Sequence, residues 1–107
     1  MSGRIKGQGS NWIRRAKRLA IYRRDNHSCI YCQADLAQAV ATLDHVVACE
    51  LGGSNAEQNL VTACLSCNSA KRDLPLAKFL GKLSDDGIDA GGIRKRIRRN
   101  TRRKLVR

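Results

Sequence analysis

The chain has 107 residues and a formal net charge of +12, with five cysteines. This length predicts one small domain whose hydrophobic core is marginal and would gain stability from a bound metal. No apolar run reaches the roughly 18 residues of a membrane span, and no signal-peptide core follows the first residues. We therefore expect a soluble, cytoplasmic protein with no membrane partner. The odd number of cysteines argues against a disulfide framework.

Charge is distributed unevenly along the chain. Residues 1–24 carry eight Lys and Arg and no acid, residues 25–73 carry two against six acids, and residues 74–107 carry eleven against three. An acidic centre between two basic arms is typical of a cation-dependent site whose flanks bind a polyanion. A merely soluble, highly charged surface is the alternative, but this asymmetry favours nucleic acid.

The N-terminal part predicts a leader and a basic helix. Residues 1–10 are rich in Gly and Ser and should be flexible, whereas apolar residues recur at helical spacing over residues 11–24. One face of this helix should pack against the domain. The other face carries Arg14, Arg15 and Arg18, which either contact phosphates or form a solvated surface.

Two Cys-x-x-Cys pairs mark the middle of the chain, Cys29 with Cys32 and Cys64 with Cys67. Each pair can reach one ion from a tight turn, and two such turns supply the tetrahedral thiolate shell typical of structural zinc. A redox role for the pairs is the alternative. Cys49 lies outside the pattern, and we interpret it as a small core residue or a free thiol.

Between and after the pairs, the sequence predicts a hairpin and two helices. β-Branched residues favour strands at residues 42–47 and 59–63, with a glycine-containing loop between them. After the second cysteine pair, Asn68 should begin a helix, and Pro75 should open another.

The last residues form a predicted basic tail, residues 85–107. Glycines mark a hinge at its start, and nine of the last fourteen residues are Lys or Arg. Ile93 and Ile97 do not make a convincing core face. We therefore expect the tail to be disordered or a nascent helix when free, and to become ordered on nucleic acid.

These motifs resemble those of the HNH endonucleases in order and in spacing, over roughly residues 25–80. The matching pieces are Cys29-x-x-Cys32, Asp44-His45-Val46-Val47, Gly52-Gly53-Ser54-Asn55, Asn59-Leu60-Val61 and Cys64-x-x-Cys67-Asn68-x-x-Lys71. The resemblance implies the ββα-metal (His-Me finger) fold, a small α+β domain over residues 11–84. In it a two-stranded hairpin packs on a helix, with the catalytic metal between them. A structural zinc would staple this fold, with the basic helix before it and the basic tail after it.

Phosphodiester hydrolysis needs an activated water and a cation that stabilises the developing negative charge. By resemblance, His45 activates the water, Asp44 binds the metal, and Asn59 braces the loop and orients the histidine. Asn68 supplies a second oxygen ligand where many family members have histidine. An oxygen ligand set favours magnesium or manganese.

The first functional hypothesis is a metal-dependent endonuclease that nicks or cleaves DNA and, as the resemblance implies, leaves 3′-hydroxyl and 5′-phosphate ends. Lys71 and Arg72 are candidate phosphate contacts, with a charged helix face as the alternative. RNA presents the same phosphate and stays open as a substrate. Proteins of this kind resemble those of phages and mobile elements, which implies partners in genome packaging or recombination.

The sequence is also consistent with two other functions. A zinc-containing nucleic-acid-binding module without catalysis would bind phosphate through the same basic arms, and Asp44 and His45 would then be structural. A redox switch would use the cysteine pairs and would release zinc on oxidation.

Overall fold

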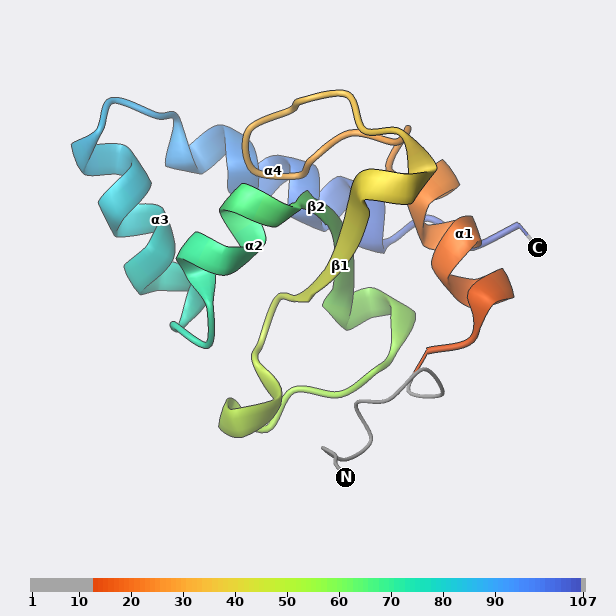
Figure 1. The fold of residues 1–107 in the computed structure, drawn as a ribbon. Coiled ribbons are helices and arrows are strands. Elements are labelled where there is room, and N and C mark those ends of the chain that lie inside the picture. Colours follow the sequence, from red (N-terminus) through yellow and green to blue (C-terminus); the bar gives the residue numbers. More distant parts are fainter. Residues whose placement is uncertain (1–12, 107) are drawn as a thin grey trace.

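The computed structural model describes residues 13–106 (Figure 1). The predicted leader, residues 1–10, lies outside this range. The helices and strands are α1 (Arg15–Arg24), β1 (Ala41–His45), β2 (Leu60–Cys64), α2 (Leu65–Lys71), α3 (Leu76–Asp85) and α4 (Ala90–Thr101). Short 3-10 turns lie at η1 (Gln38–Val40), η2 (Cys49–Leu51) and η3 (Glu57–Asn59). No helix within residues 13–106 is both long and apolar enough to cross a membrane.

A hairpin and the helix that follows it form the centre of the molecule. Strands β1 and β2 pair antiparallel, from Ala41 opposite Cys64 to His45 opposite Leu60. Helix α2 follows β2 directly, so the order is strand, long loop, strand, helix (Figure 1). The predicted hairpin is confirmed, but α2 begins before Asn68. It starts at Leu65 because the Cys64 sulfur caps it by accepting the backbone N–H of Cys67.

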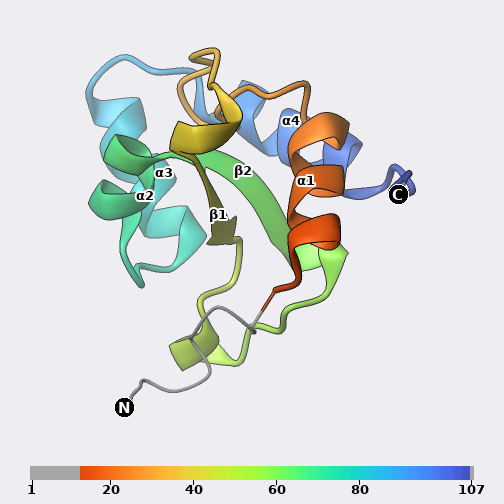
Figure 2. The same ribbon diagram turned by 45° about the vertical axis from the view of Figure 1, so that its right-hand side comes forward.

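Strand β2 separates two hydrophobic clusters because successive side chains point to opposite faces. Val61 and Ala63 pack in a cluster with Phe79 of α3. Leu60 packs in the other cluster with Ile21 of α1. Figure 2 accordingly shows α1 on one side of β2 and α3 on the other. The hairpin is thus packed on both faces. Strand β1, at its outer edge, carries the polar side chains of Asp44 and His45.

Helix α4 corrects the expectation for the tail. Ile93 is fully buried and Ile97 is 9% exposed, and both belong to the cluster that contains Val61. Asp89 caps the helix by accepting the backbone N–H of Gly92 at 3.0 Å. Because the two isoleucines lie four residues apart on one helical face, they make a core stripe that the surrounding arginines obscure in the sequence. The segment is therefore an ordered, packed helix.

A buried ion pair fixes the end of α1 to β2. The Arg24 guanidinium donates to both carboxylate oxygens of Asp25, at 2.9 and 3.2 Å, and to the carbonyl oxygen of Leu60 at 2.6 Å. Asp25 in turn accepts the backbone N–H of Thr62 at 2.8 Å. Both charged side chains are almost completely buried, so the pair is part of the core.

Candidate active site and metal centre

The four cysteines of the two pairs come together in space. Their sulfur atoms all lie within 4.8 Å of one another, and Sγ of Cys32 is 3.9 Å from Sγ of Cys64. Four thiolates around tetrahedral zinc, with bonds of about 2.3 Å, lie roughly 3.8 Å apart. In each pair the second cysteine also donates its backbone N–H to the first sulfur. The cluster is therefore compatible with structural zinc.

The electrostatics of the cluster also favour a cation. Burial raises the pKa of the Cys29 thiol. Burial, and then the charges of the neighbouring sulfurs, raise the pKa of Cys67. Thiols packed this closely cannot all ionise unless a positive ion compensates them, and binding of a divalent metal supplies that compensation.

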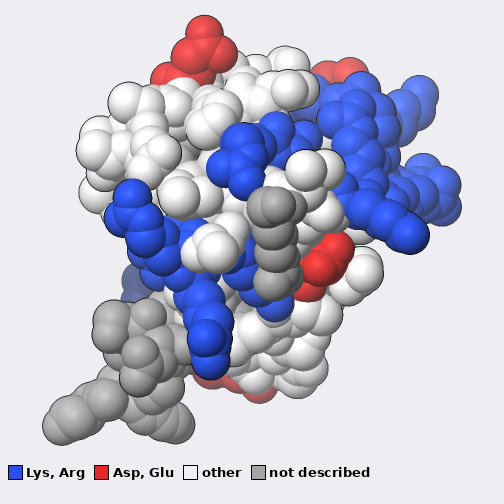
Figure 3. Space-filling model, turned by 90° about the vertical axis from the view of Figure 1, so that its right-hand side faces the viewer, with Lys and Arg blue, Asp and Glu red and all other residues white. Residues whose placement is uncertain are grey.

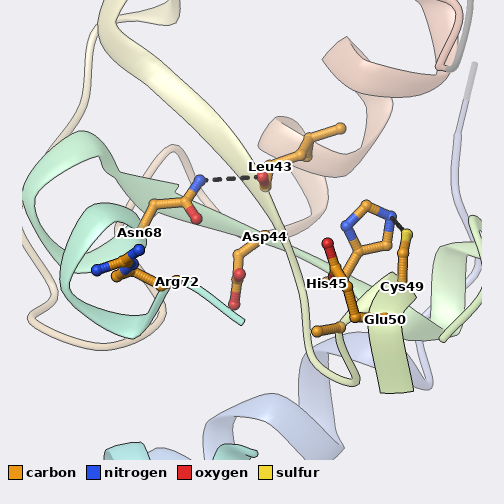
Figure 4. Close-up of a pocket in the computed structure, with 8 residues that line it drawn as sticks. Leu43, Asp44, His45, Cys49, Glu50, Asn68 and Arg72 are labelled. Carbon is orange, nitrogen blue, oxygen red and sulfur yellow. Dashed lines mark hydrogen bonds between the residues drawn. The ribbon is translucent and has the colours of Figure 1, made fainter. Parts of the chain in front are cut away.

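A separate polar pocket of about 210 Å³ lies where β1, η2 and α2 meet (Figure 4). It is lined by Leu43, Asp44, His45, Ala48, Cys49, Glu50, Asn68 and Arg72. Four of the predicted site residues are therefore brought together here: Asp44, His45, Asn68 and Arg72. Two others, Asn59 and Lys71, lie beside the pocket without lining it.

Asp44 lies at the base of the pocket and is held by two buried groups. Its side chain accepts the hydroxyl of Tyr31, and its Oδ2 lies 3.4 Å from the ammonium of Lys71. Burial raises the pKa of Asp44, while the Tyr31 hydroxyl and the Lys71 charge lower it. Burial also raises the pKa of Tyr31, followed by the charge of Asp44, so this hydroxyl stays a donor.

The position of Lys71 differs from that expected of a phosphate contact. The residue is completely buried, and its ammonium also donates to the backbone carbonyl of His45 at 2.8 Å. It therefore holds the carboxylate and the backbone of the Asp44-His45 pair from inside the domain. A contact with phosphate would require the buried ion pair to open, which is costly.

Asn68 presents an oxygen to the pocket. Its Nδ2 donates to Oγ1 of Thr42 at 2.9 Å and to the carbonyl oxygen of Leu43 at 3.1 Å. Because a carbonyl can only accept, the amide nitrogen must face Leu43, and Oδ1 points the other way. Figure 4 shows Oδ1 on the side of Asp44. Two oxygen atoms that could bind a metal ion, one from Asp44 of β1 and one from Asn68 of α2, thus face the same pocket.

His45 lies on the opposite side of the pocket. Its Nε2 is 2.7 Å from Oδ1 of Asn55 and 3.6 Å from Sγ of Cys49 (Figure 4). An amide oxygen only accepts hydrogen bonds, so this contact is a hydrogen bond in the tautomer whose Nε2 carries the proton, and in that tautomer Nδ1 is the acceptor nitrogen. Cys49 is exposed and its thiol is free, so the interpretation as a core residue is wrong and that as a free thiol is confirmed.

Asn59 braces the loop between the strands. Its Oδ1 accepts the backbone N–H of Val47 at 2.8 Å, and its Nδ2 donates to the carbonyls of Val47 and Ser54 at 3.0 and 2.8 Å. The fit leaves no room for a side chain at Gly53, where a Cβ would lie 1.7 Å from the Val47 oxygen. These contacts hold the loop that carries Asn55, whose Oδ1 contacts His45.

Comparison with known proteins identifies the family. A family model described as HNH endonuclease matches residues 29–83. The chain belongs to the HNH endonuclease family. Among solved structures, this HNH chain resembles the type II-C Cas9 enzyme from Actinomyces naeslundii, with a TM-score of 0.60 and 22% sequence identity. The likeness covers 94% of the HNH chain and 14% of that enzyme, and at this identity it shows the fold alone. No curated protein matches the HNH chain.

The comparisons confirm the predicted resemblance and the small α+β fold of this HNH domain, whose four cysteines cluster as predicted. Sequence reasoning missed Tyr31, which reaches Asp44 from the turn between Cys29 and Cys32. An aromatic residue between the two cysteines of a Cys-x-x-Cys pair is the only signal in the sequence for this contact. Through this hydrogen bond, Tyr31 connects the cysteine cluster to the pocket.

Basic side chains of the HNH domain gather on the face formed by α1 and the C-terminal end of the chain, where acidic side chains are sparse (Figure 3). Arg14 and Arg15 are exposed, and Arg18 is half-buried. Helix α1 also touches the loop of the site, because Lys17 donates to the Asn55 carbonyl at 2.6 Å. This basic surface therefore continues toward the loop that contacts His45.

Proposed function

We propose that this HNH domain is a metal-dependent endonuclease that hydrolyses phosphodiester bonds in DNA. The observation that carries the proposal is the convergence of Asp44, His45 and Asn68 on one open pocket, with Arg72 at its edge. The three side chains come from a strand and a helix braced by buried contacts, as a preorganised catalytic site requires.

The donor set of the pocket fits a hard divalent cation. The Asp44 carboxylate and Oδ1 of Asn68 would hold magnesium or manganese, with waters and a substrate phosphate completing the shell. Such an ion, when bound, supplies positive charge that stabilises the scissile phosphate and the departing oxygen. Lys71 neutralises part of the Asp44 charge from behind and keeps the carboxylate in place for this role.

His45 would perform the proton transfer. Its Nδ1 would accept a proton from a water molecule, whose oxygen forms a bond to phosphorus while the bond from phosphorus to the 3′ oxygen breaks. The released 3′ oxygen would take up a proton from a solvent water molecule. The products would be a 3′-hydroxyl and a 5′-phosphate. Asn55 holds the imidazole by its Nε2, and the exposed Arg72 is placed to bind a non-bridging phosphate oxygen. Arg14, Arg15 and Arg18 would bind neighbouring phosphates of the same substrate.

We also propose that the four-cysteine cluster binds one zinc ion with a structural role only. All four ligand positions of a tetrahedral ion would be filled by sulfur, which leaves no open position for substrate or water. The ion would fix the turn that carries Tyr31 and the start of α2, and so both walls of the pocket.

The proposal is tested by plasmid cleavage with magnesium or manganese. Wild-type protein should nick or cut supercoiled DNA, and His45→Ala should lose about 10²- to 10⁴-fold in rate. His27→Asn is a matched control because His27, the other histidine of the chain, lies in a loop with a left-handed φ of 54° that asparagine tolerates. The His27→Asn protein should cleave DNA at the wild-type rate. Cutting by His45→Ala at the wild-type rate would contradict the mechanism, and an RNA substrate in parallel defines the substrate class.

A second function is favoured by one observation, the buried ion pair of Asp44 with Lys71. If this pair is purely structural, the domain would be a non-catalytic zinc-containing module that binds nucleic acid. Binding of labelled DNA without cleavage under any of several divalent metals would favour that function.

A further inference from the structure

A second polar cavity, of about 160 Å³, lies between α4 and the loop that leads from α1 into the first cysteine turn. It is lined by Asp25, Asn26, Ser28, Cys29, Ile30, Gln33, Arg96, Arg99 and Asn100. It shares no lining residue with the pocket that contains His45. We propose that this cavity binds a backbone phosphate of the nucleic acid, away from the phosphate that is cleaved. The ligand class rests on the proposed function.

Two guanidinium groups of α4 face this cavity with donors to spare. Arg96 donates Nε to the carbonyl of Ile30 at 3.1 Å and Nη2 to that of Tyr31 at 3.3 Å, so its plane is fixed against the cysteine turn. Arg99 donates Nε to Oδ1 of Asn100 at 3.3 Å, and among residues 13–106 its two terminal nitrogens have no hydrogen-bond acceptor, which leaves them for a ligand. Two planar cations, one of them fixed against the backbone, suit the oxygens of one phosphate group.

Asn100 supplies the observation that points to a ligand. The residue is only 5% exposed, and its Oδ1 accepts from Arg99. In residues 13–106, Nδ2 of Asn100 has no hydrogen-bond acceptor. A buried donor without an acceptor is destabilising, so such groups normally bind an oxygen from water or from a ligand. A phosphate oxygen between the two arginines would satisfy this amide.

The acidic groups of the lining do not cancel the arginine charges. Asp25 is the single acid among the described residues that line the cavity, and its carboxylate oxygens are already bonded to Arg24 and to the backbone N–H of Thr62. Cys29 also lines the cavity, and thiolates bound to zinc would carry negative charge. The alternative role of Arg96 and Arg99 is therefore to balance that charge, and it predicts a different outcome below.

The surface around the cavity favours a polymer over a free ion. Lys95 is exposed on α4 four residues before Arg99, and Arg102 is exposed directly after the helix, three residues after Arg99. This spacing puts both on the side of α4 that carries Arg99. A phosphate held at Arg99 would therefore have further cations in line with it, as the backbone of a nucleic acid requires. Free phosphate would gain little from these neighbours.

The test compares two variants that each remove one exposed positive charge from α4. Arg99→Ala changes the cavity, whereas Arg94→Ala is the matched control because Arg94 lies on another side of the helix and does not line it. Affinity for a fluorescent DNA duplex is measured by anisotropy over a range of salt concentrations, without added divalent metal. We expect Arg99→Ala to lose about five- to tenfold in affinity and to reduce the salt slope by about one, and Arg94→Ala to lose less than about twofold.

Equal losses in the two variants would overturn the proposal in favour of a general basic surface. If Arg99→Ala lowers zinc retention or the melting temperature but leaves DNA affinity unchanged, the arginines balance the thiolates and no phosphate site exists. Inorganic phosphate is the other source of the ligand: if millimolar phosphate stabilises wild type but not Arg99→Ala, and DNA affinity is unchanged, the nucleic-acid assignment fails. Absence of cleavage by wild type would refute the proposed function and leave the phosphate site standing. The two failures are distinguishable because the binding comparison does not depend on cutting.

Discussion

The cysteine cluster and the candidate active-site pocket hold their polar groups in different ways. The cluster offers four like sulfurs that face one another, two of which accept backbone N–H groups of their own turns. The pocket offers unlike groups, namely an acid, an imidazole and an amide oxygen, that face open space. A closed set of like ligands suits a structural ion, and an open, mixed set suits exchange of substrate and water.

A short path joins these two regions. Tyr31 leaves the first cysteine turn, packs edge-on against Phe79 at 5.2 Å between ring centres, and donates its hydroxyl to Asp44. From the second pair, α2 carries Asn68 to the Leu43 carbonyl and Lys71 to the Asp44 carboxylate, both in β1. Order in the cluster should therefore be necessary for geometry in the pocket, while loss of pocket chemistry should leave the cluster intact.

The largest expected effect comes from breaking the cluster. Cys64→Ser removes one of the four sulfurs, and structural zinc contributes about 10–16 kcal/mol of binding free energy in small zinc domains. This exceeds or matches the stability of a typical domain, about 5–15 kcal/mol. We therefore expect an unfolded protein without bound zinc, measured by circular dichroism and metal analysis. Cys49→Ser, at the free thiol, should melt as wild type does. A folded Cys64→Ser protein with a normal melting temperature would refute the zinc staple.

Asp44→Asn should abolish cleavage and also destabilise the fold. The substitution leaves the Lys71 ammonium buried without its carboxylate, and removal of one partner of a buried ion pair costs about 3–5 kcal/mol. Urea unfolding would measure this loss. The double variant Asp44→Asn with Lys71→Met removes both charges and should regain most of the stability but no activity. Cleavage by the double variant would show that Asp44 is structural only.

Tyr31→Phe tests the path between the regions. The ring can still pack against Phe79, but Asp44 loses a hydrogen bond, which should cost about 1–3 kcal/mol of folding stability. Loss of a group that orients a metal ligand typically lowers metal affinity or activity about 10- to 100-fold. We expect slower cleavage and a higher magnesium concentration for the half-maximal rate, with zinc content unchanged. Unchanged cleavage kinetics would mean that the hydroxyl does not position Asp44.

The smallest expected effect separates charge from backbone strain at Arg72. This residue ends α2 with φ of 52° and ψ of −129°, a conformation that favours glycine. Arg72→Gly and Arg72→Ala both remove the guanidinium from the pocket, so both should slow cleavage to the same degree. Arg72→Gly should be more stable than Arg72→Ala by about 1 kcal/mol in thermal unfolding. If only the alanine variant slows cleavage, the backbone turn matters more than the charge.

Local patterns in the sequence predicted most of the cysteine cluster, the hairpin and the pocket. The cysteine pairs and the hairpin depend on short-range spacing, and the convergence of Asp44, His45 and Asn68 followed from the resemblance of their motifs. The buried pair of Lys71 with Asp44 was not predicted, because it joins residues 27 positions apart and an isolated lysine normally stays exposed. Helix α4 was missed because two isoleucines are a weak hydrophobic signal among so many basic residues.

The most direct test measures zinc content and cleavage rate in the same samples. A mild chelator should strip the weakly held ion of the pocket and leave the zinc of the cysteine cluster in place. Because the pocket is proposed to use magnesium or manganese, cleavage should then fall to background with zinc retained, and added magnesium should restore it. Cleavage that persists in samples stripped of magnesium and manganese, or that added magnesium does not restore while zinc is retained, would contradict the division between a structural cluster and a catalytic pocket.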